Sequence, residues 1–179
     1  LLELQKQRGP LVKSLTATAM VYRLGEQYGV PVHETPVGFK YVSQVMLREN
    51  ALMGGEESGG YGFRGHVLER DGILAALYFL DLMVGMSKNP SQLVDYLYKK
   101  VGPHYYHRHD ITLHPQQQAG LTERIAAQRP RSLAGLEVIG QDAPDGLRFR
   151  MADGSWLLIR ISGTEPLLRI YAESSSLAQ

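Results

Sequence analysis

The sequence has 179 residues, a length that allows one medium domain or two small ones. Hydrophobic residues make up 44% and charged residues 21%, a balance typical of folded globular proteins rather than disordered ones. The formal net charge is +1 and there is no cysteine. These values disfavour electrostatic binding of nucleic acid and exclude disulfides, thiolate zinc sites and a cysteine nucleophile.

The sequence has no segment typical of a membrane span or a secretion signal. Its longest apolar stretch, Ile73–Val84, contains Asp81 and is shorter than the roughly 18 residues that a transmembrane helix needs. The first residues form a charged amphipathic segment rather than a signal peptide. We therefore expect a cytoplasmic protein with no membrane or nucleic-acid partner. The missing initiating Met predicts a piece of a longer chain.

Residues 1–103 alternate short apolar runs with segments of helical periodicity. Strands are predicted at residues 11–12, 30–32 and 51–53. The helices between them are expected to end at Gly29, in the left-handed conformation, and near Asn50. This alternation of strand and helix is typical of a parallel α/β sheet.

Two further helices complete this predicted α/β domain. Asp71 is expected to cap the first of them, over residues 73–84, and Ser91 the second. The first is apolar almost all round, which predicts that it is buried.

Residues 104–179 have a different pattern and predict a smaller α+β domain. A strand is expected over residues 105–113 and a short helix over 121–128. Apolar residues then alternate with Arg148 and Arg150, and a hairpin turn is predicted at Asp153–Gly154. Further strands at residues 156–161 and 167–172 complete an antiparallel sheet.

A glycine-rich acidic segment, Gly54–Gly60, follows the third predicted strand and is called the glycine loop below. Loops at the carboxyl ends of parallel strands are where open α/β sheets bind ligands. The loop is neither a phosphate-binding P-loop nor the elbow of serine hydrolases. Its carboxylates and hydroxyl suit the vicinal hydroxyl groups of a polyol, and a solvated acidic turn is the alternative interpretation.

A basic segment near the C-terminus, Arg160–Arg169, is called the arginine turn below. Strand alternation points Arg160 away from the apolar residues on either side of it. Arg169 follows on the next strand, and the turn between them adds polar groups from Ser162, Gly163 and Thr164. Such groups suit a phosphate dianion, with Glu165 orienting an arginine. The alternative is a polar β-turn with a flanking salt bridge.

Four histidines lie near the predicted domain junction, at positions 104, 107, 109 and 114. His107 and His109 would share one face of a strand, so a metal site is one interpretation. Asp110 is the nearby carboxylate. The other interpretation is an aromatic and polar linker strand, and we expect no metal ligands in this chain.

Several runs of the sequence, taken in order, resemble the α-D-phosphohexomutase family. They are residues 34–41 (Glu-Thr-Pro-Val-Gly-Phe-Lys-Tyr), the glycine loop with residues 62–66, residues 71–73 and the arginine turn. The resemblance covers nearly the whole chain. It implies most of the family's third domain, a parallel-sheet α/β domain whose N-terminal part is incomplete, followed by most of its fourth domain. The Glu-Glu-Ser and Gly-Phe-Lys runs are most similar to phosphoglucomutases.

The resemblance also implies roles for individual residues. Glu56 and Ser58 would bind the ring hydroxyls of a sugar, and the phosphate would be bound by Arg160, Ser162, Gly163, Thr164 and Arg169. Arg70 stands where some phosphoglucomutases have a lysine proposed for proton transfer, and Gly59-Gly60 stands where the family often has Gly-His. Since arginine stays protonated near neutral pH, Lys13 and Lys40 join Arg70 as catalytic candidates.

The activity implied is an intramolecular phosphotransfer that interconverts glucose 1-phosphate and glucose 6-phosphate through a phosphoserine and glucose 1,6-bisphosphate. In the family the phosphoserine and the Mg²⁺-binding Asp-x-Asp-x-Asp loop lie in the first two domains, and this sequence contains no Asp-x-Asp spacing. We therefore expect the chain to bind a phosphorylated hexose but to need its own N-terminal domains for turnover. The alternatives are a phosphomannomutase, a bifunctional phosphohexomutase, or a non-catalytic phosphosugar-binding module.

Overall fold

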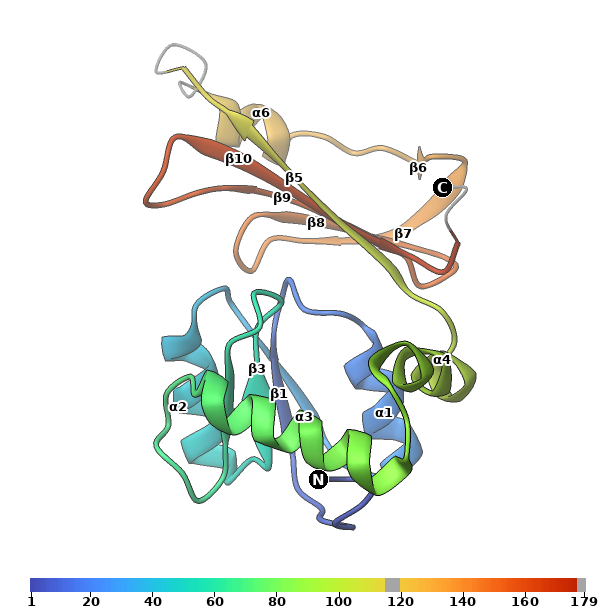
Figure 1. Ribbon diagram of the computed structural model, residues 1–179. Coiled ribbons are helices and arrows are strands. Elements are labelled where there is room, and N and C mark those ends of the chain that lie inside the picture. Colours follow the sequence, from blue (N-terminus) through green and yellow to red (C-terminus); the bar gives the residue numbers. More distant parts are fainter. Residues whose placement is uncertain (115–119, 177–179) are drawn as a thin grey trace. The chain divides into compact units, whose positions relative to one another are not determined.

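The computed structural model describes residues 1–114 and 120–176. The chain divides into two compact units, Leu1–Pro103 and His104–Gln179. Figure 1 shows the first unit in blue to green and the second in yellow to red. Each unit is described by itself.

The first unit is built on a four-stranded sheet with the strand order β2-β1-β3-β4. Its strands are β1 (Leu11–Ser14), β2 (Val32–Thr35), β3 (Met53–Gly55) and β4 (Tyr61–Phe63). β1 pairs in parallel with β2 and with β3, whereas β4 is antiparallel to β3. The predicted parallel α/β sheet is confirmed, and β4, which returns from the glycine loop, was not predicted.

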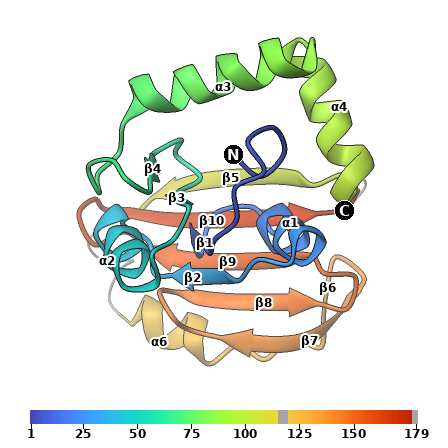
Figure 2. The same ribbon diagram turned by 90° about the horizontal axis from the view of Figure 1, so that it is seen from below.

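Helices α1 (Met20–Tyr28) and α2 (Phe39–Glu49) connect the parallel strands. Figure 2 shows them on opposite sides of β1. This follows from the strand order, because the chain moves from β1 outward to β2 and then back past β1 to β3. α1 ends at Gly29, which has a φ of 62° in the left-handed region, as predicted. The carboxyl end of β1 is therefore the topological switch point, where open α/β sheets bind ligands.

Each face of this sheet carries its own apolar cluster. Leu11 and Val12 are successive residues of β1, so their side chains point to opposite faces. Val12 packs in one cluster with Val42 and Met46 of α2, and Leu11 packs in the other with Val30 and Leu52. The alternation within one short strand thus anchors both helix layers.

Helix α3 (Gly72–Met86) corrects one prediction. Asp71 caps it as expected, since its carboxylate accepts the Leu74 N–H at 2.9 Å. However, none of its residues is buried, and Ile73 and Val84 are 79% and 70% exposed. Apolarity indicates that a helix can be buried, but burial also needs a facing layer. Within the first unit α3 contacts β4 and the N-terminal segment, which cover it only in part.

Helix α4 (Pro90–Val101) corrects a second prediction, because Asn89 rather than Ser91 caps it. The Asn89 side chain accepts the Gln92 N–H and the Gln92 side chain accepts the Asn89 N–H, both at 3.0 Å. Pro90 at the first helical position favours this start. None of the helices in the described part of the chain has the length and apolarity that a membrane span requires.

A polar network joins the N-terminal segment to α1 and α4. The Glu3 carboxylate accepts hydrogen bonds from Tyr28 Oη, from Tyr96 Oη at 2.6 Å and from Lys100 Nζ at 2.9 Å. These three hydrogen bonds lower the pKa of Glu3 from 4.5 to about 2. The ionised form of Glu3 is therefore favoured in the folded protein.

Glu3→Gln is expected to destabilise the full-length protein by about 1–2 kcal/mol near neutral pH, after allowance for the partial exposure of the side chain. Since the folded-state pKa is the lower one, the stabilisation is present above the unfolded pKa of 4.5 and is lost as the pH falls from there to about 2. Denaturant titrations at several pH values and hydrogen exchange of the α4 amides measure the effect. Equal behaviour of Glu26→Gln, which changes an exposed α1 carboxylate, contradicts it.

The second unit contains a six-stranded antiparallel sheet with the order β5-β10-β9-β8-β7-β6. Its strands are β5 (Tyr105–Thr112), β6 (Ser132–Leu133), β7 (Leu136–Asp142), β8 (Leu147–Met151), β9 (Trp156–Ile161) and β10 (Leu167–Ser174). Helix α6 (Leu121–Ala126) precedes β6. The apolar residues of β8 are buried, as their alternation with Arg148 and Arg150 predicts. The predicted α+β fold with an antiparallel sheet is confirmed.

Candidate functional site

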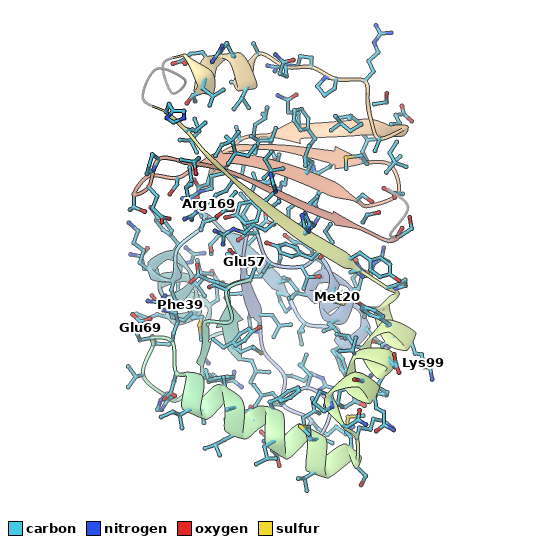
Figure 3. The ribbon with its side chains drawn as sticks, turned by 45° about the horizontal axis from the view of Figure 1, so that its top comes forward. Met20, Phe39, Glu57, Glu69, Lys99 and Arg169 are labelled. Carbon is cyan, nitrogen blue, oxygen red and sulfur yellow. The ribbon has the colours of Figure 1, made fainter. Side chains whose placement is uncertain are left out.

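The loops that follow β1, β2 and β3 meet at the carboxyl edge of the parallel strands. The Gly38 N–H, after β2, donates to Glu56 Oε1 of the glycine loop at 3.0 Å. Thr16 Oγ1, after β1, donates to Glu57 Oε2 at 2.5 Å, and Ser14 Oγ lies 3.4 Å from the same oxygen. Glu57 is labelled in Figure 3. The two adjacent carboxylates therefore tie the glycine loop to both neighbouring loops.

Within the glycine loop, Glu56 is nearly enclosed, with 7% of its surface exposed, whereas Ser58 is exposed. Burial raises the pKa of Glu56, and the hydrogen bond from Gly38 opposes this rise. The nearby charges of Glu57 and Glu69 add to the rise, and that of Arg70 opposes it. The loop thus offers one enclosed acceptor and one accessible hydroxyl.

Lys13 is a buried cation at the same edge of the sheet. Its side chain is 4% exposed, and its Nζ lies 3.0 Å from Glu34 Oε2 on β2. Tyr22 Oη donates to the same Glu34 oxygen at 2.8 Å, and the Tyr22 ring centroid lies 4.8 Å from Lys13 Nζ. A buried ammonium needs such compensation. The contacts hold Lys13 in one place beside the loops.

The other two cationic candidates have different surroundings. Lys40, near the start of α2, is exposed, and its Nζ lies 4.8 Å from the ring centroid of Tyr41. Arg70 precedes α3, is more than half exposed, and pairs through Nε with Glu69 Oε1 at 3.1 Å. Of the three candidates, only Lys13 is buried among the residues of the carboxyl edge.

The arginine turn joins β9 to β10 in the second unit. Arg160 and Arg169 are direct partners in the antiparallel register, so their side chains share one face of the sheet. Arg160 Nε donates to Asp145 Oδ1 at 3.0 Å. Arg169 pairs with Glu165, and its Nε lies 3.8 Å from Asp110 Oδ2. Glu165 therefore contacts an arginine, and its role in orienting that arginine stays a prediction.

Two guanidinium groups at directly opposed positions repel each other unless negative charge compensates them, and Asp145, Glu165 and Asp110 supply part of that charge here. Both side chains are mostly buried: 15% of the Arg160 side chain and 18% of the Arg169 side chain is exposed. Ser162 is also buried, while Gly163 and Thr164 are exposed. A Cβ at Gly163 would meet nothing within 4 Å, so the turn leaves open space at that position. This arrangement suits an anion.

The histidines of residues 104–114 and the family resemblance both raise the question of whether this chain binds a metal ion. His107 and His109 lie on β5, opposite Ala172 and Ile170 of β10. Within residues 1–114 and 120–176, no group of three or more His, Cys, Asp or Glu side chains could hold a metal ion. Together with the missing Asp-x-Asp spacing, this means that the described residues do not fit a Mg²⁺ site.

Sequence reasoning missed the residues that support the candidates. Glu34 was part of a matching run but was given no role, and Tyr22 and Asp145 were not singled out. Lys13 and Glu34 are paired in the parallel register of β1 and β2. A lysine and a glutamate at equivalent places of two predicted parallel strands were the available signal. No comparable pattern in the sequence predicts the contact between Arg160 and Asp145, which lies in the loop from β7 to β8.

Comparison with known proteins identifies both units. Residues 1–101 match the family model described as phosphoglucomutase/phosphomannomutase, alpha/beta/alpha domain III. Residues 123–179 match the one described as phosphoglucomutase/phosphomannomutase, C-terminal domain.

Individual relatives carry related names. A phosphoglucomutase/phosphomannomutase of Thermococcus kodakarensis is 30% identical over 94% of this chain, and a phosphoglucosamine mutase of Limosilactobacillus fermentum is 31% identical over 93%. The crystal structure of a putative phosphomannomutase from Thermus thermophilus is 34% identical over 96% of the chain, with a TM-score of 0.77. The chain spans 34% of each of these proteins, about a third of their length.

Proposed function

Because the chain belongs to the phosphoglucomutase/phosphomannomutase family, we propose that it is the substrate-binding part of an enzyme that interconverts glucose 1-phosphate and glucose 6-phosphate. The observation that carries the proposal is the carboxyl edge of the first unit, where the glycine loop presents Glu56 and Ser58 beside the buried Lys13. The Glu-Glu-Ser sequence of this loop favours glucose. A relative named phosphoglucomutase, from Rhizobium radiobacter, is 29% identical over 91% of the chain.

Residues 1–103 are the proposed sugar-binding domain. Glu56 accepts hydrogen bonds from ring hydroxyl groups, and Ser58 exchanges hydrogen bonds with them. Lys13 is the proposed proton donor and acceptor for the reacting hydroxyl group, because it lies buried at the switch point of the sheet. Arg70, which stays protonated, contributes charge, and Lys40 is the rival candidate for proton transfer.

Residues 104–179 are the proposed phosphate-binding domain. Arg160 and Arg169 bind the phosphate group that does not react, with hydroxyl and backbone groups from Ser162, Gly163 and Thr164. The phosphoserine and the Mg²⁺ ligands belong to the enzyme's N-terminal domains, so this chain binds substrate but does not turn it over. When bound, Mg²⁺ neutralises charge that develops during phosphoryl transfer.

A single set of contacts serves both directions of the reaction. In one half-reaction the 6-phosphate is held while the 1-position of the sugar reacts. Glucose 1,6-bisphosphate then reorients in the site, and in the second half-reaction the 1-phosphate is held while the 6-position reacts. A hydroxyl and a carboxylate on one loop can bind either pose of the ring, since vicinal hydroxyl groups recur around it. The arginine turn recognises only the phosphate.

Ser58→Ala in the full-length enzyme is expected to lower kcat/KM about threefold to tenfold for both glucose 1-phosphate and glucose 6-phosphate, because one hydrogen bond to the ring is lost. Steady-state kinetics in both directions measure this loss. Ser91→Ala, which changes an exposed hydroxyl on α4, serves as the matched control. Normal kinetics of Ser58→Ala in either direction would remove Ser58 from the site.

A panel of substrates tests the choice of sugar. The full-length enzyme is expected to act faster on glucose 1-phosphate than on mannose 1-phosphate or glucosamine 1-phosphate. A faster reaction with mannose 1-phosphate would instead support the phosphomannomutase interpretation, which the name of the Thermus thermophilus structure favours. Binding without turnover of any of the three sugars would support a phosphosugar-binding module.

A further inference from the structure

Gly60, the last residue of the glycine loop, lies directly against the side chain of Arg70. A Cβ added at Gly60 would lie 2.5 Å from Arg70 Cδ and 2.9 Å from Arg70 Cγ, so any side chain at this position would force Arg70 to move. Gly60 is not among the glycines with positive φ, so the backbone itself does not require glycine there. What glycine provides at this position is room for Arg70.

Phe39 and Glu69 both contact the other end of the Arg70 side chain. The guanidinium carbon of Arg70 lies 5.7 Å from the ring centroid of Phe39, within the range of a cation–π contact. Phe39 is buried in the cluster beneath α2, so its ring is a fixed platform. Figure 3 labels Phe39 and Glu69, the neighbour of Arg70 in the chain. Gly62 packs against Phe39 and against the backbone of Glu69, since a Cβ at Gly62 would lie 2.9 Å from Phe39 Cζ and 3.5 Å from the Glu69 carbonyl oxygen.

The position of Arg70 matters for the enclosed acceptor of the loop. Burial and the charges of Glu57 and Glu69 raise the pKa of Glu56, while the charge of Arg70 and the Gly38 N–H oppose the rise. The Glu56 N–H donates to the carbonyl oxygen of Gly60 at 3.0 Å, so Glu56 is bonded to the residue against which Arg70 lies. Together with the Gly38 N–H, the charge of Arg70 favours the ionised form of Glu56. A protonated carboxyl group would be a poorer acceptor for sugar hydroxyls.

We propose that Gly60, Phe39 and Arg70 form one positioning unit, in which the bare backbone of Gly60 lets Arg70 cross the glycine loop and the Phe39 ring holds its charge near Glu56. The proposal rests on the function proposed above. A side chain at position 60 and Arg70 in its present place exclude each other. Arg70 acts through Glu56 and is therefore a positioning residue.

A double-mutant cycle in the full-length enzyme tests the unit. Gly60→Ala and Arg70→Ala are each expected to lower kcat/KM for glucose 1-phosphate about tenfold. Gly60→Ala should still fold, because only a flexible side chain has to move. In the Arg70→Ala background, Gly60→Ala should have no further effect, since the side chain that it displaces is gone. Independent, multiplicative losses would overturn the proposal.

The dependence of kcat/KM on pH is a further measurement, and it would not change if Arg70 had a purely structural role. Loss of the nearby positive charge raises the pKa of Glu56 further, so the acid limb of kcat/KM should move to higher pH in Gly60→Ala and in Arg70→Ala. Arg70→Lys keeps a positive charge and should restore the limb. Gly72→Ala is the matched control, because a Cβ there meets nothing within 4 Å. An unmoved acid limb in Arg70→Ala would overturn the proposal.

The same unit can be tested apart from the proposed activity. Titration of the Glu56 carboxyl group by NMR, in full-length protein labelled at glutamate, should show a higher pKa in Gly60→Ala and in Arg70→Ala than in the wild type. If the wild type turns over no hexose phosphate while these shifts occur, the proposed function fails and the unit stands. If the wild type is active and Glu56 titrates alike in all variants, the unit fails and the function stands.

Discussion

Arg160→Ala in the full-length enzyme is expected to raise KM for both glucose 1-phosphate and glucose 6-phosphate about 10- to 100-fold, with a smaller change in kcat. The range corresponds to the loss of a charge-assisted hydrogen bond to a phosphate. Arg160 is suited to such a contact because Asp145 holds its Nε at 3.0 Å and so fixes the direction of the guanidinium fork. Steady-state kinetics and calorimetric binding of glucose 6-phosphate both measure the effect.

Two variants separate a phosphate contact from a structural effect. Arg160→Lys keeps the charge but loses the planar fork, so an intermediate KM is expected. Arg150→Ala removes an arginine of the same sheet that is 55% exposed and lies 3.8 Å from Asp142, and it should leave KM unchanged. An unaltered KM in Arg160→Ala, or an equal increase in Arg150→Ala, would be incompatible with phosphate binding at the arginine turn.

Local patterns predicted the elements that carry the candidate site. A strand at the start of the glycine loop and the strand before the arginine turn follow from short apolar runs bounded by glycine, serine or proline, although β3 covers Met53–Gly55 rather than the predicted residues 51–53. Alternation in the latter strand placed Arg160 on the face opposite to Ile159 and Ile161, and the register then sets it opposite Arg169. Each of these features depends on residues that are close together in the sequence, so one sequence is enough to predict them.

Contacts between distant parts of the chain could not be predicted in this way. The burial of Lys13 depends on Glu34 and Tyr22, which come from a different strand and a helix. The exposure of α3 depends on which layers face it, and its apolar composition carries no information about that. The contact of the Arg70 side chain with Gly60 depends on how β4 follows the glycine loop. β4 has only three residues, which is too short for a strand to be predicted from the sequence.

Lys13→Met in the full-length enzyme is expected to lower kcat about 100-fold or more, as for the loss of a positioned acid–base group. Lys13 fits this role because it is buried at the carboxyl edge, and because Glu34 and Tyr22 hold its ammonium in one place. Lys40→Met is expected to have a smaller effect, since that side chain is exposed against Tyr41. Pre-steady-state measurement of phosphoryl transfer distinguishes slower chemistry from slower product release.

The Lys13 variant leaves the Glu34 carboxylate without its ammonium partner, which can destabilise the protein by about 3–5 kcal/mol. Lys13→Met combined with Glu34→Gln avoids that charge, so the double variant should fold well and still lack activity. Lys99→Met, on the exposed side of α4, controls for the loss of any lysine. If the double variant regains most of the wild-type kcat, Lys13 is a structural cation, and proton transfer has to be assigned to Lys40 or to a residue of the N-terminal domains.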